Sequence, residues 1–421
     1  MPHEGTHPVV HVRTLRIGMI GIGVGGAEIL PAMEAMDTIE VVAGADIVPT
    51  TLERFSQRFP SARTHASAEA LCQDADVDAV WVSSPNRFHA DHTILAANSG
   101  KHVVVEKPMA VTLEDAVRMV EAAERNGVKL LAGHTRAFTL PIRAMRRVID
   151  SGKYGRLRAL NIWSYSDWML RPRTADELDV SQGGGIPYRQ GPHQVDTVRL
   201  LGGGMLRSVR AQVGQWMPQR PIPGYYAAFL EFEDGTPATI VHNGYGYFLG
   251  AELVPWGEDR QRYTAEERAA IRTALRNGTR AEAAEKQALR IGGEQERVLF
   301  RGDQSRTWVP EDMGMAIASL DFADVRQSRY GLYLHSDAGK QDIDIVAGRP
   351  MGVAQRRAEL EELYDAVVRG KPVWHDGRWG MATLEVCLAI MNSARKHQEI
   401  RLHHQIPVPA AYDADFVVPG L

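Results

Sequence analysis

A short apolar segment that runs directly into a glycine-rich loop restricts the fold of this chain more than any other feature. Residues 15–20 are typical of a buried strand, and Gly21-Ile22-Gly23-Val24-Gly25-Gly26 follows without a break. In a G-x-G-x-x-G loop the first glycine permits a tight turn, the second lets the backbone approach a pyrophosphate, and the third lets the next helix pack closely. We therefore predict a dinucleotide site at Gly21, Gly23, Val24 and Gly26, with the phosphates at the helix amino terminus.

An acidic residue at the end of the next predicted strand supports this interpretation and bears on the choice of cofactor. The strand at residues 39–45 ends in Asp46, 20 residues after Gly26. A carboxylate at this place accepts hydrogen bonds from the adenosine ribose hydroxyls, and it repels a 2′-phosphate. No arginine directly follows Asp46, and Arg54 in the next helix is expected to be solvated. The sequence therefore predicts NAD, with NADP as the less favoured cofactor.

Strands and helices continue to alternate up to about residue 135, which is typical of a doubly wound parallel sheet. Predicted strands at 77–82, 103–108 and 129–133 end in turns, and ligands bind at the carboxyl ends of strands in sheets of this kind. The residues at these ends that we place in the cofactor site are Ser84, Pro85, Asn86, Glu106 and Lys107.

Two side chains in this region have both an ordinary and a functional interpretation. Lys107 beside Glu106 is either half of a surface ion pair or an acid–base group that faces a bound ligand, and the tripeptide alone favours the surface pair. His89 and His92 stand three residues apart without an acidic or third ligand nearby, so we predict no metal site. We instead expect His89 to begin a helix beside the cofactor and to belong to its site.

Length, charge and cysteine content exclude several classes of protein. A chain of 421 residues is expected to hold two domains, which we place at 14–135 and 136–421. A formal net charge of −4 without a Lys/Arg-rich run argues against a nucleic-acid partner. The two cysteines fit no disulfide or zinc pattern, and no apolar run approaches the roughly 20 residues of a membrane span. Residues 1–13 lack the apolar core of a signal peptide, so we expect a cytoplasmic protein without a membrane partner.

The glycine loop, Asp46, the Ser84-Pro85-Asn86 turn with His89, and Glu106-Lys107-Pro108 resemble the Gfo/Idh/MocA oxidoreductases in order and spacing. The resemblance covers the first 200 residues and resumes near 355–405. It implies that Lys107 lies beside the nicotinamide and the substrate and takes part in proton transfer, which reverses the interpretation of the tripeptide alone. It also implies an α+β second domain with an open, mostly antiparallel sheet, and a homo-oligomer that is a dimer or a tetramer.

The second domain carries an unusual aromatic and cationic stretch from Trp163 to Arg173, at the end of a predicted strand at 157–165. The resemblance places substrate contacts in this stretch. Trp168, Arg171 and Arg173 belong either to a surface loop over core tryptophans or to a flat cationic pocket for a ring that bears carboxylates, because arginine forks match carboxylates. Both interpretations stay open.

A histidine motif follows at residues 183–196. Family members commonly carry an aspartate four residues before the histidine and another three residues after it; here His193 and Asp196 match, whereas Arg189 replaces the first aspartate. This replacement speaks against a sugar and favours an anionic substrate, with Arg189 and Gln190 among its contacts. His193 can act as a general base for a hydroxyl, since an ordinary imidazole titrates near neutral pH, and a structural histidine is the alternative.

The remaining segments predict a hairpin, an insertion and two closing helices. Residues 226–233 and 236–242 alternate and are joined by Asp234-Gly235, which is typical of a β-hairpin. Residues 252–310 are polar and rich in helix formers, and we predict a partly helical, solvated insertion into the second domain. Helices are expected at 354–369 and 379–396.

Within the family, the stretch 168–173, the variation at 188–190 and the insertion are similar to the phthalate cis-dihydrodiol dehydrogenases. This resemblance implies the NAD-dependent oxidation of 4,5-dihydro-4,5-dihydroxyphthalate, or of a related carboxylated cis-diol, to the dihydroxy aromatic acid. The expected partner is thus a small anionic ring. Two alternatives are a sugar or polyol (inositol-type) dehydrogenase of the same family, and a non-catalytic NAD-binding regulator.

The resemblance also implies how the reaction is divided among the residues. Lys107 or His193 takes the proton of one ring hydroxyl, and the sequence does not rank the two. Arg189, together with Arg171 or Arg173, holds the carboxylates of the substrate.

Overall fold

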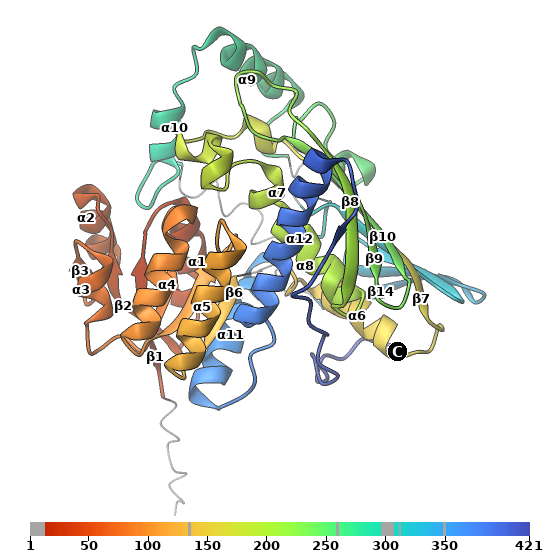
Figure 1. Ribbon diagram of the computed structural model, residues 1–421, viewed down its shortest axis with the longest axis horizontal. Coiled ribbons are helices and arrows are strands. Elements are labelled where there is room, and N and C mark those ends of the chain that lie inside the picture. The colour runs from red at the N-terminus through yellow and green to blue at the C-terminus, as the bar shows by residue number, and fades with distance from the viewer. Residues whose placement is uncertain (1–12, 134–135, 258–260, 296–306, 311–312, 348–350) are drawn as a thin grey trace, which may run out of the picture.

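A six-stranded parallel sheet forms the amino-terminal part of the molecule (Figure 1). The computed structural model describes residues 13–133, 136–257, 261–295, 307–310, 313–347 and 351–421. The strand order is β3-β2-β1-β4-β5-β6, so the direction in which the sheet grows reverses between β1 and β4, and the predicted doubly wound sheet is confirmed. The strands are β1 (Leu15–Ile20), β2 (Ile39–Ala45), β3 (Arg63–His65), β4 (Ala79–Val82), β5 (His102–Glu106) and β6 (Leu130–Gly133).

Helices cover both faces of this sheet because its strands are apolar on both sides. One face packs against α1 (Val24–Glu34), and the other packs against α3 (Ala68–Cys72), α4 (His89–Asn98) and α5 (Leu113–Arg125). Helix α2 (Pro49–Arg58) follows β2. Thr112 caps α5 by accepting a hydrogen bond from the Asp115 N–H. The strand expected at 103–108 ends at Glu106, so Lys107 and Pro108 lie just beyond it.

A nine-stranded sheet forms the second part of the molecule, in the order β14-β13-β12-β11-β7-β10-β9-β8-β15. All neighbouring strands are antiparallel except β7 and β10, so the predicted mostly antiparallel sheet is confirmed. The predicted hairpin is β9 and β10. The strands are β7 (Leu157–Tyr165), β8 (Leu206–Gly214), β9 (Tyr225–Phe232), β10 (Pro237–Asn243), β11 (Met315–Leu320), β12 (Ala323–Gln327), β13 (Gly331–Ser336), β14 (Gly339–Asp344) and β15 (Ile400–Arg401).

One face of the nine-stranded sheet is covered by helices α6 (Leu140–Asp150), α8 (Gly191–Leu201) and α12 (Gly377–Lys396). No helix in the described part of the chain covers the other face around the half-exposed side chains of Trp163 and Phe229, and we call it the open face. Figure 1 shows α12 running between the two parts of the molecule. Helix α11 (Met351–Val368) places Leu360, Leu363 and Tyr364 in the core of the first sheet, so the end of the chain joins the two parts. The boundary predicted at residue 135 lies outside the described residues.

The insertion is partly helical as predicted, with α9 (Ala265–Asn277) and α10 (Glu282–Ala288), and these helices are largely exposed, as expected of a solvated insertion. It is nevertheless attached to the rest of the molecule. Its Lys286 pairs with Glu177, and its Ile291 is buried in the apolar core beside Ile22 and Phe55 of the first sheet. Arg54, also expected to be solvated, donates a hydrogen bond to the Ile291 carbonyl. The insertion thus contacts both parts of the molecule. Residues 258–260 and 296–306 of it lie outside the described residues.

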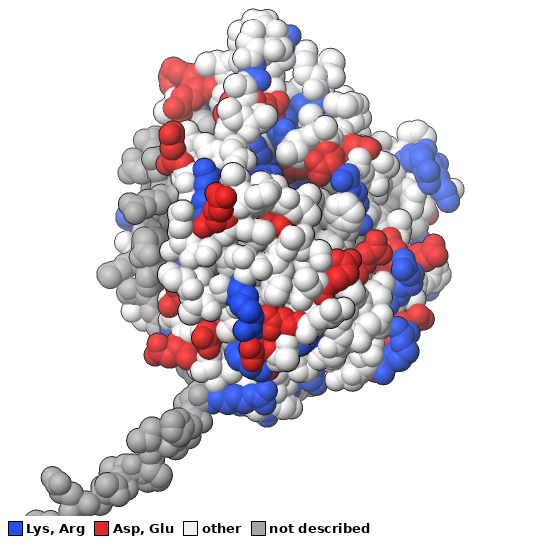
Figure 2. Space-filling view, turned by 90° about the vertical axis from the view of Figure 1, so that its left-hand side faces the viewer, with Lys and Arg blue, Asp and Glu red and all other residues white. Residues whose placement is uncertain are grey.

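No helix in the described ranges is both long and apolar enough to span a bilayer. On the face drawn in Figure 2, basic and acidic side chains are interspersed in small groups.

Candidate active site

One large cavity lies between the two parts of the molecule, at the carboxyl ends of β1, β4 and β5. We call it the central cavity; its volume is about 990 Å³. It lies where the strand order reverses, which is where open α/β sheets bind ligands. The predicted site residues that line it are Gly21, Gly23, Val24, Asp46, Ser84, Pro85, Asn86, His89, Glu106, Lys107, Trp168, Arg171, Arg173, Arg189, Gln190 and His193. Gly26 is the one predicted site residue that lies outside this lining.

The glycine loop leaves room for a ligand at the amino terminus of α1. Gly21 has a φ of +82°, which favours glycine, and a Cβ at Gly26 would lie 2.6 Å from the Gly21 carbonyl oxygen. Gly26 therefore acts through packing rather than by facing the cavity. A Cβ at Gly23 would meet no atom within 4 Å, and no side chain caps the helix there. This open space beside uncapped backbone N–H groups fits the pyrophosphate of NAD.

Asp46 is held by the backbone around it. Its Oδ2 accepts a hydrogen bond from the Ile22 N–H at 2.9 Å, and its Oδ1 accepts one from the Val48 N–H at 2.9 Å. These contacts fix the carboxylate just after β2 and beside the glycine loop. Each carboxylate oxygen can accept a further hydrogen bond, so this geometry fits a ribose hydroxyl.

His89 joins two turns in the wall of the cavity. Its ring nitrogens lie 2.8 Å from the Pro108 carbonyl oxygen and 2.7 Å from the Ser84 carbonyl oxygen. Burial lowers the pKa of His89 to about 4, although the contacts with the Pro108 and Ser84 carbonyl oxygens favour the charged ring. The contacts connect the turn after β4 with the turn after β5. His89 therefore positions the segment that carries Lys107.

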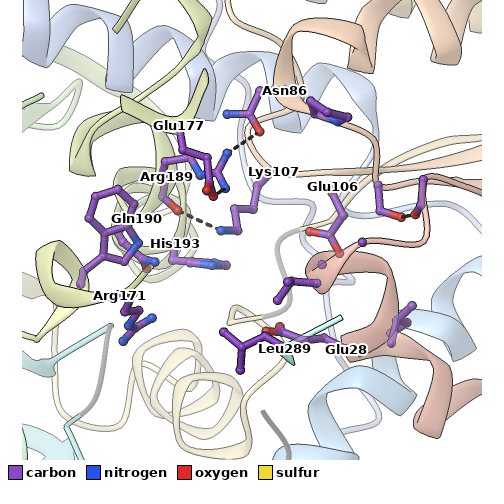
Figure 3. Close-up of a pocket in the computed structure, with 18 of the residues that line it drawn as sticks. Glu28, Asn86, Glu106, Lys107, Arg171, Glu177, Arg189, Gln190, His193 and Leu289 are labelled. Carbon is purple, nitrogen blue, oxygen red and sulfur yellow. Dashed lines mark hydrogen bonds and ion pairs between the residues drawn. The ribbon is translucent and has the colours of Figure 1, made fainter. Parts of the chain in front are cut away.

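Lys107 reaches from the first part of the molecule to the second. Its Nζ donates a hydrogen bond to the Arg189 carbonyl oxygen at 2.9 Å, at the end of the short helix α7 (Ile186–Arg189). Figure 3 shows the Lys107 amino group, the His193 ring and the Glu106 carboxyl turned toward the same space. Burial raises the pKa of Glu106 to about 7 although Lys107 opposes the shift. An amine, an imidazole and a carboxyl thus surround one space, which suits acid–base chemistry.

His193 lies in the first turn of α8 and is 8% exposed. Gln190, just before this helix, is buried, and its Oε1 has no hydrogen-bond partner among the described residues. Asp196 completes the motif in sequence but not in space, because it is fully buried and its Oδ1 accepts a hydrogen bond from the Trp379 indole N–H. His193 and Gln190 therefore line the cavity, whereas Asp196 contacts the core around α12.

A buried carboxylate that sequence reasoning missed, Glu177, organises the cationic side of the cavity. Its Oε1 accepts from Arg189 Nη2 at 2.7 Å, and its two oxygens lie 3.0 and 2.8 Å from Lys286 Nζ. Arg173 Nη1 lies 3.5 Å from Oε1. Burial favours a higher pKa for Glu177, but Arg173, Arg189 and Lys286 outweigh it and hold the pKa far below the ordinary range. We call these four residues the Glu177 cluster.

The Glu177 cluster has three cations and one carboxylate, so it carries two positive charges in excess. Burial lowers the pKa of Arg173 to about 9, and its cationic neighbours Arg189 and Arg171 add to the shift while Glu177 opposes it. Burial also lowers the pKa of Lys286. Unbalanced positive charge with little access to solvent attracts anions. No pattern in the sequence marks Glu177, which stands in an ordinary Thr-x-x-Glu turn, and Lys286 lies in the insertion expected to be solvated.

The aromatic and cationic stretch combines its two interpretations. Trp168 is a core residue with 2% exposure, and the Arg173 guanidinium lies over its ring at 3.6 Å from the centroid. Arg171 donates from Nε to Asp167 at 3.1 Å. Trp163 lies instead on the open face of the sheet. The arginines that we predicted to meet substrate thus line the cavity while they also bind carboxylates of the chain.

The described residues contain no group of three or more His, Cys, Asp or Glu side chains placed to hold a metal ion.

Two family descriptions match the chain. "Oxidoreductase family, NAD-binding Rossmann fold" matches residues 15–134, and "GFO/IDH/MocA C-terminal domain" matches residues 142–247. A relative from Comamonas testosteroni named 1-carboxy-3-chloro-3,4-dihydroxycyclo hexa-1,5-diene dehydrogenase is 33% identical over 90% of this chain and 95% of its own length. The chain belongs to the Gfo/Idh/MocA oxidoreductase family.

Two further similarities agree with this assignment. Inositol 2-dehydrogenase 2 from Saccharopolyspora erythraea is 31% identical over 57% of this chain and 71% of its own length. The crystal structure of a putative dehydrogenase from Bordetella bronchiseptica RB50 has a TM-score of 0.82 and 32% identity, and it covers 92% of this chain and all of that one. As a Gfo/Idh/MocA oxidoreductase the chain is an NAD-binding enzyme, and the alternative of a non-catalytic regulator is set aside.

Proposed function

We propose that this enzyme oxidises a carboxylated cis-dihydrodiol, of the 4,5-dihydro-4,5-dihydroxyphthalate type, to the corresponding dihydroxy aromatic acid. The observation that carries the proposal is the unbalanced positive charge of the Glu177 cluster opposite Lys107 and His193 in one cavity. A polyol has no negative charge to meet these cations. The printed name of the Comamonas relative, a carboxylated dihydroxycyclohexadiene dehydrogenase, supports the same class of substrate.

The residues on the two sides of the cavity divide the work of the reaction. When bound, NAD supplies the hydride acceptor. Lys107 or His193 accepts the proton of the reacting hydroxyl, and the Arg189 carbonyl oxygen holds the Lys107 amine in place. The buried Gln190 Oε1 offers a hydrogen-bond acceptor to the second hydroxyl. The cations of the Glu177 cluster orient the ring through its carboxylates, so that the carbinol carbon faces the nicotinamide.

A substrate panel tests this proposal. The purified protein is mixed with NAD and with cis-dihydrodiols that carry no, one or two carboxylates, and the appearance of NADH is followed by its absorbance. We expect turnover only with carboxylated dihydrodiols. The inositol dehydrogenase similarity makes myo-inositol and glucose the matched controls. Turnover of these polyols without any response to carboxylated diols would replace the proposal by a polyol dehydrogenase.

We also propose that the enzyme is a homo-oligomer, a dimer or a tetramer, that forms through the open face of the nine-stranded sheet. Trp163 on β7 and Phe229 on β9 lie on this face and are 45% and 48% exposed. A second copy offers the same mixed apolar and polar face, as a two-fold interface requires. Light scattering should then give a multiple of the chain mass, and Trp163→Glu should lower the measured mass.

We also propose a cytoplasmic location, which the free, buried Cys72 and Cys387 support.

A further inference from the structure

Helix α10 of the insertion lies over the substrate side of the central cavity. Arg220 contacts Glu282 at 2.9 Å, and the Arg173 N–H donates to the same carboxylate at 2.7 Å. Arg280, just before α10, donates to the Leu170 carbonyl and pairs with Glu285. These contacts attach α10 to the segment that carries Arg171 and Arg173. The helix is therefore a fixed part of the cavity wall.

The segment that follows α10 returns to the cofactor side. Leu289 lines the central cavity, and Ile291 is 1% exposed in the core that also contains Ile22 of the glycine loop. Residues 282–291 thus cross the cavity from the substrate domain to the NAD-binding domain. Figure 3 shows Leu289 on the side of the cavity opposite Arg189. The crossing segment is anchored at both ends, and Lys286 lies within it.

We infer that Lys286 is a specificity-determining residue which, with Arg173 and Arg189, forms a subsite for a dianion, a ring substrate with two carboxylates. This inference rests on the proposed function and adds to it which side chains hold the two carboxylates of a phthalate-type substrate. Glu177 balances one of three cations, so two positive charges are left for a ligand. The neighbouring cations Arg171 and Arg220 are each paired with a carboxylate, Asp167 and Glu282.

The hydrogen-bonding state of the cluster also points to a ligand. Arg173 Nε is buried and has no hydrogen-bond partner in the described part of the chain. A buried guanidinium N–H without an acceptor is costly, and a carboxylate of the substrate supplies the missing acceptor. Lys286 Nζ already contacts both oxygens of Glu177, and an ammonium has three donors, so a third donor remains for the substrate.

The experiment compares Lys286→Met with the wild-type enzyme on matched mono- and dicarboxylated cis-dihydrodiols. Because a charged hydrogen bond is lost, we expect kcat/KM for the dicarboxylate to fall about 10- to 100-fold, mainly through KM. The monocarboxylate should lose less than about 3-fold, which is near the lower end of what one ordinary hydrogen bond contributes. Lys286→Arg keeps the charge and should restore most of the discrimination. NAD affinity, measured by calorimetry, should be unchanged in both variants.

Glu285→Gln is the matched control, since it lies on the same helix and loses an ion pair with Arg280 without touching Glu177. It should leave the ratio of the two substrates unchanged. Equal losses on both substrates with Lys286→Met, or a wild-type enzyme that does not distinguish them, would overturn the inference.

A binding measurement separates this inference from the proposed function and remains informative if a variant is inactive. Calorimetry with the holoenzyme measures phthalate against benzoate as unreactive dianion and monoanion. We expect phthalate to bind at least about 10-fold more tightly than benzoate to the wild-type enzyme, and Lys286→Met to remove this difference. Failure of the proposed function gives no NADH with any carboxylated diol, whereas failure of this inference gives equal binding of the two acids.

Discussion

The two sides of the central cavity are built in different ways. The cofactor side consists of backbone that is shaped by glycines within one stretch of chain, with Asp46 fixed by two N–H groups of neighbouring loops. The substrate side consists of charged side chains, and the Glu177 cluster gathers residues that are up to 113 positions apart in the sequence, from Arg173 to Lys286.

This difference separates what a family shares from what sets a member apart. A backbone cradle at a helix amino terminus recognises a pyrophosphate whatever the other ligand is, because its donors are main-chain N–H groups. Charged side chains on a second domain and on an insertion can change without disturbing the cradle. We therefore expect variants on the cofactor side to alter NAD binding or folding, and variants on the substrate side to alter substrate selectivity alone.

Lys107 gives the largest expected effect, because the proposed mechanism assigns it to proton transfer rather than to the recognition of cofactor or substrate. Lys107→Ala should lower kcat about 10²- to 10⁴-fold, the range typical of a lost acid–base group. NAD affinity should change little, since the glycine loop and Asp46 are untouched. Single-turnover kinetics and calorimetry with NAD measure the two effects.

Lys153→Ala is the control for removing a lysine, because Lys153 is exposed and contacts the Gly420 carbonyl far from the cavity. Normal turnover by Lys107→Ala would disprove its assignment. His193→Asn, measured over the same pH range, shows which of the two groups takes the proton. The fall of kcat/KM at low pH disappears only in the variant that has lost the base.

Glu106 lines the central cavity beside Lys107, and its raised pKa makes stability depend on pH. The folded-state pKa is about 7, against 4.5 for an ordinary glutamate, so the folded state keeps a proton that the unfolded state has lost. The contribution is present below pH 4.5 and is lost as the pH rises to about 7. The free energy of unfolding should therefore fall by up to about 3 kcal/mol across this range because of Glu106.

Urea denaturation of the wild-type protein and of Glu106→Gln at several pH values measures this contribution as a difference, so that other titrating groups cancel. Glu106→Gln should remove the decrease. Glu114→Gln, which changes an exposed glutamate in the first turn of α5, should keep it. Parallel curves for the wild type and Glu106→Gln would show that Glu106 ionises in the same range in both states.

The same contrast explains how much the sequence could predict. The parallel sheet and the strand Leu157–Tyr165 can be predicted from local apolar periodicity. The site residues of the first domain lie in the turns directly after its strands, so the sequence also predicts that these residues meet in one cavity. The sequence does not predict β3, because its Arg-Thr-His segment is polar and lies at the sheet edge. The pairing of Glu177 with Lys286 cannot be predicted from the sequence, because only the fold brings the two residues together. The spacing that places Asp196 in the histidine motif also does not reveal that its side chain contacts Trp379.

Two glycines of one loop allow the sharpest test of the cofactor side, although the expected effects are the smallest. A Cβ at Gly26 meets the Gly21 carbonyl oxygen at 2.6 Å and the Ser83 Oγ at 2.7 Å, so Gly26→Ala should destabilise the fold by about 2 kcal/mol as overpacking does. A Cβ at Gly23 meets nothing within 4 Å, so Gly23→Ala should leave the melting temperature unchanged. It should nevertheless weaken NAD binding, because the methyl group occupies the space of the pyrophosphate. Gly25→Ala, which also has open space, is the control for both measurements. Were Gly23→Ala to bind NAD as tightly as Gly25→Ala does, the pyrophosphate could not lie against this loop, and the cofactor side would owe its specificity to side chains as the substrate side does.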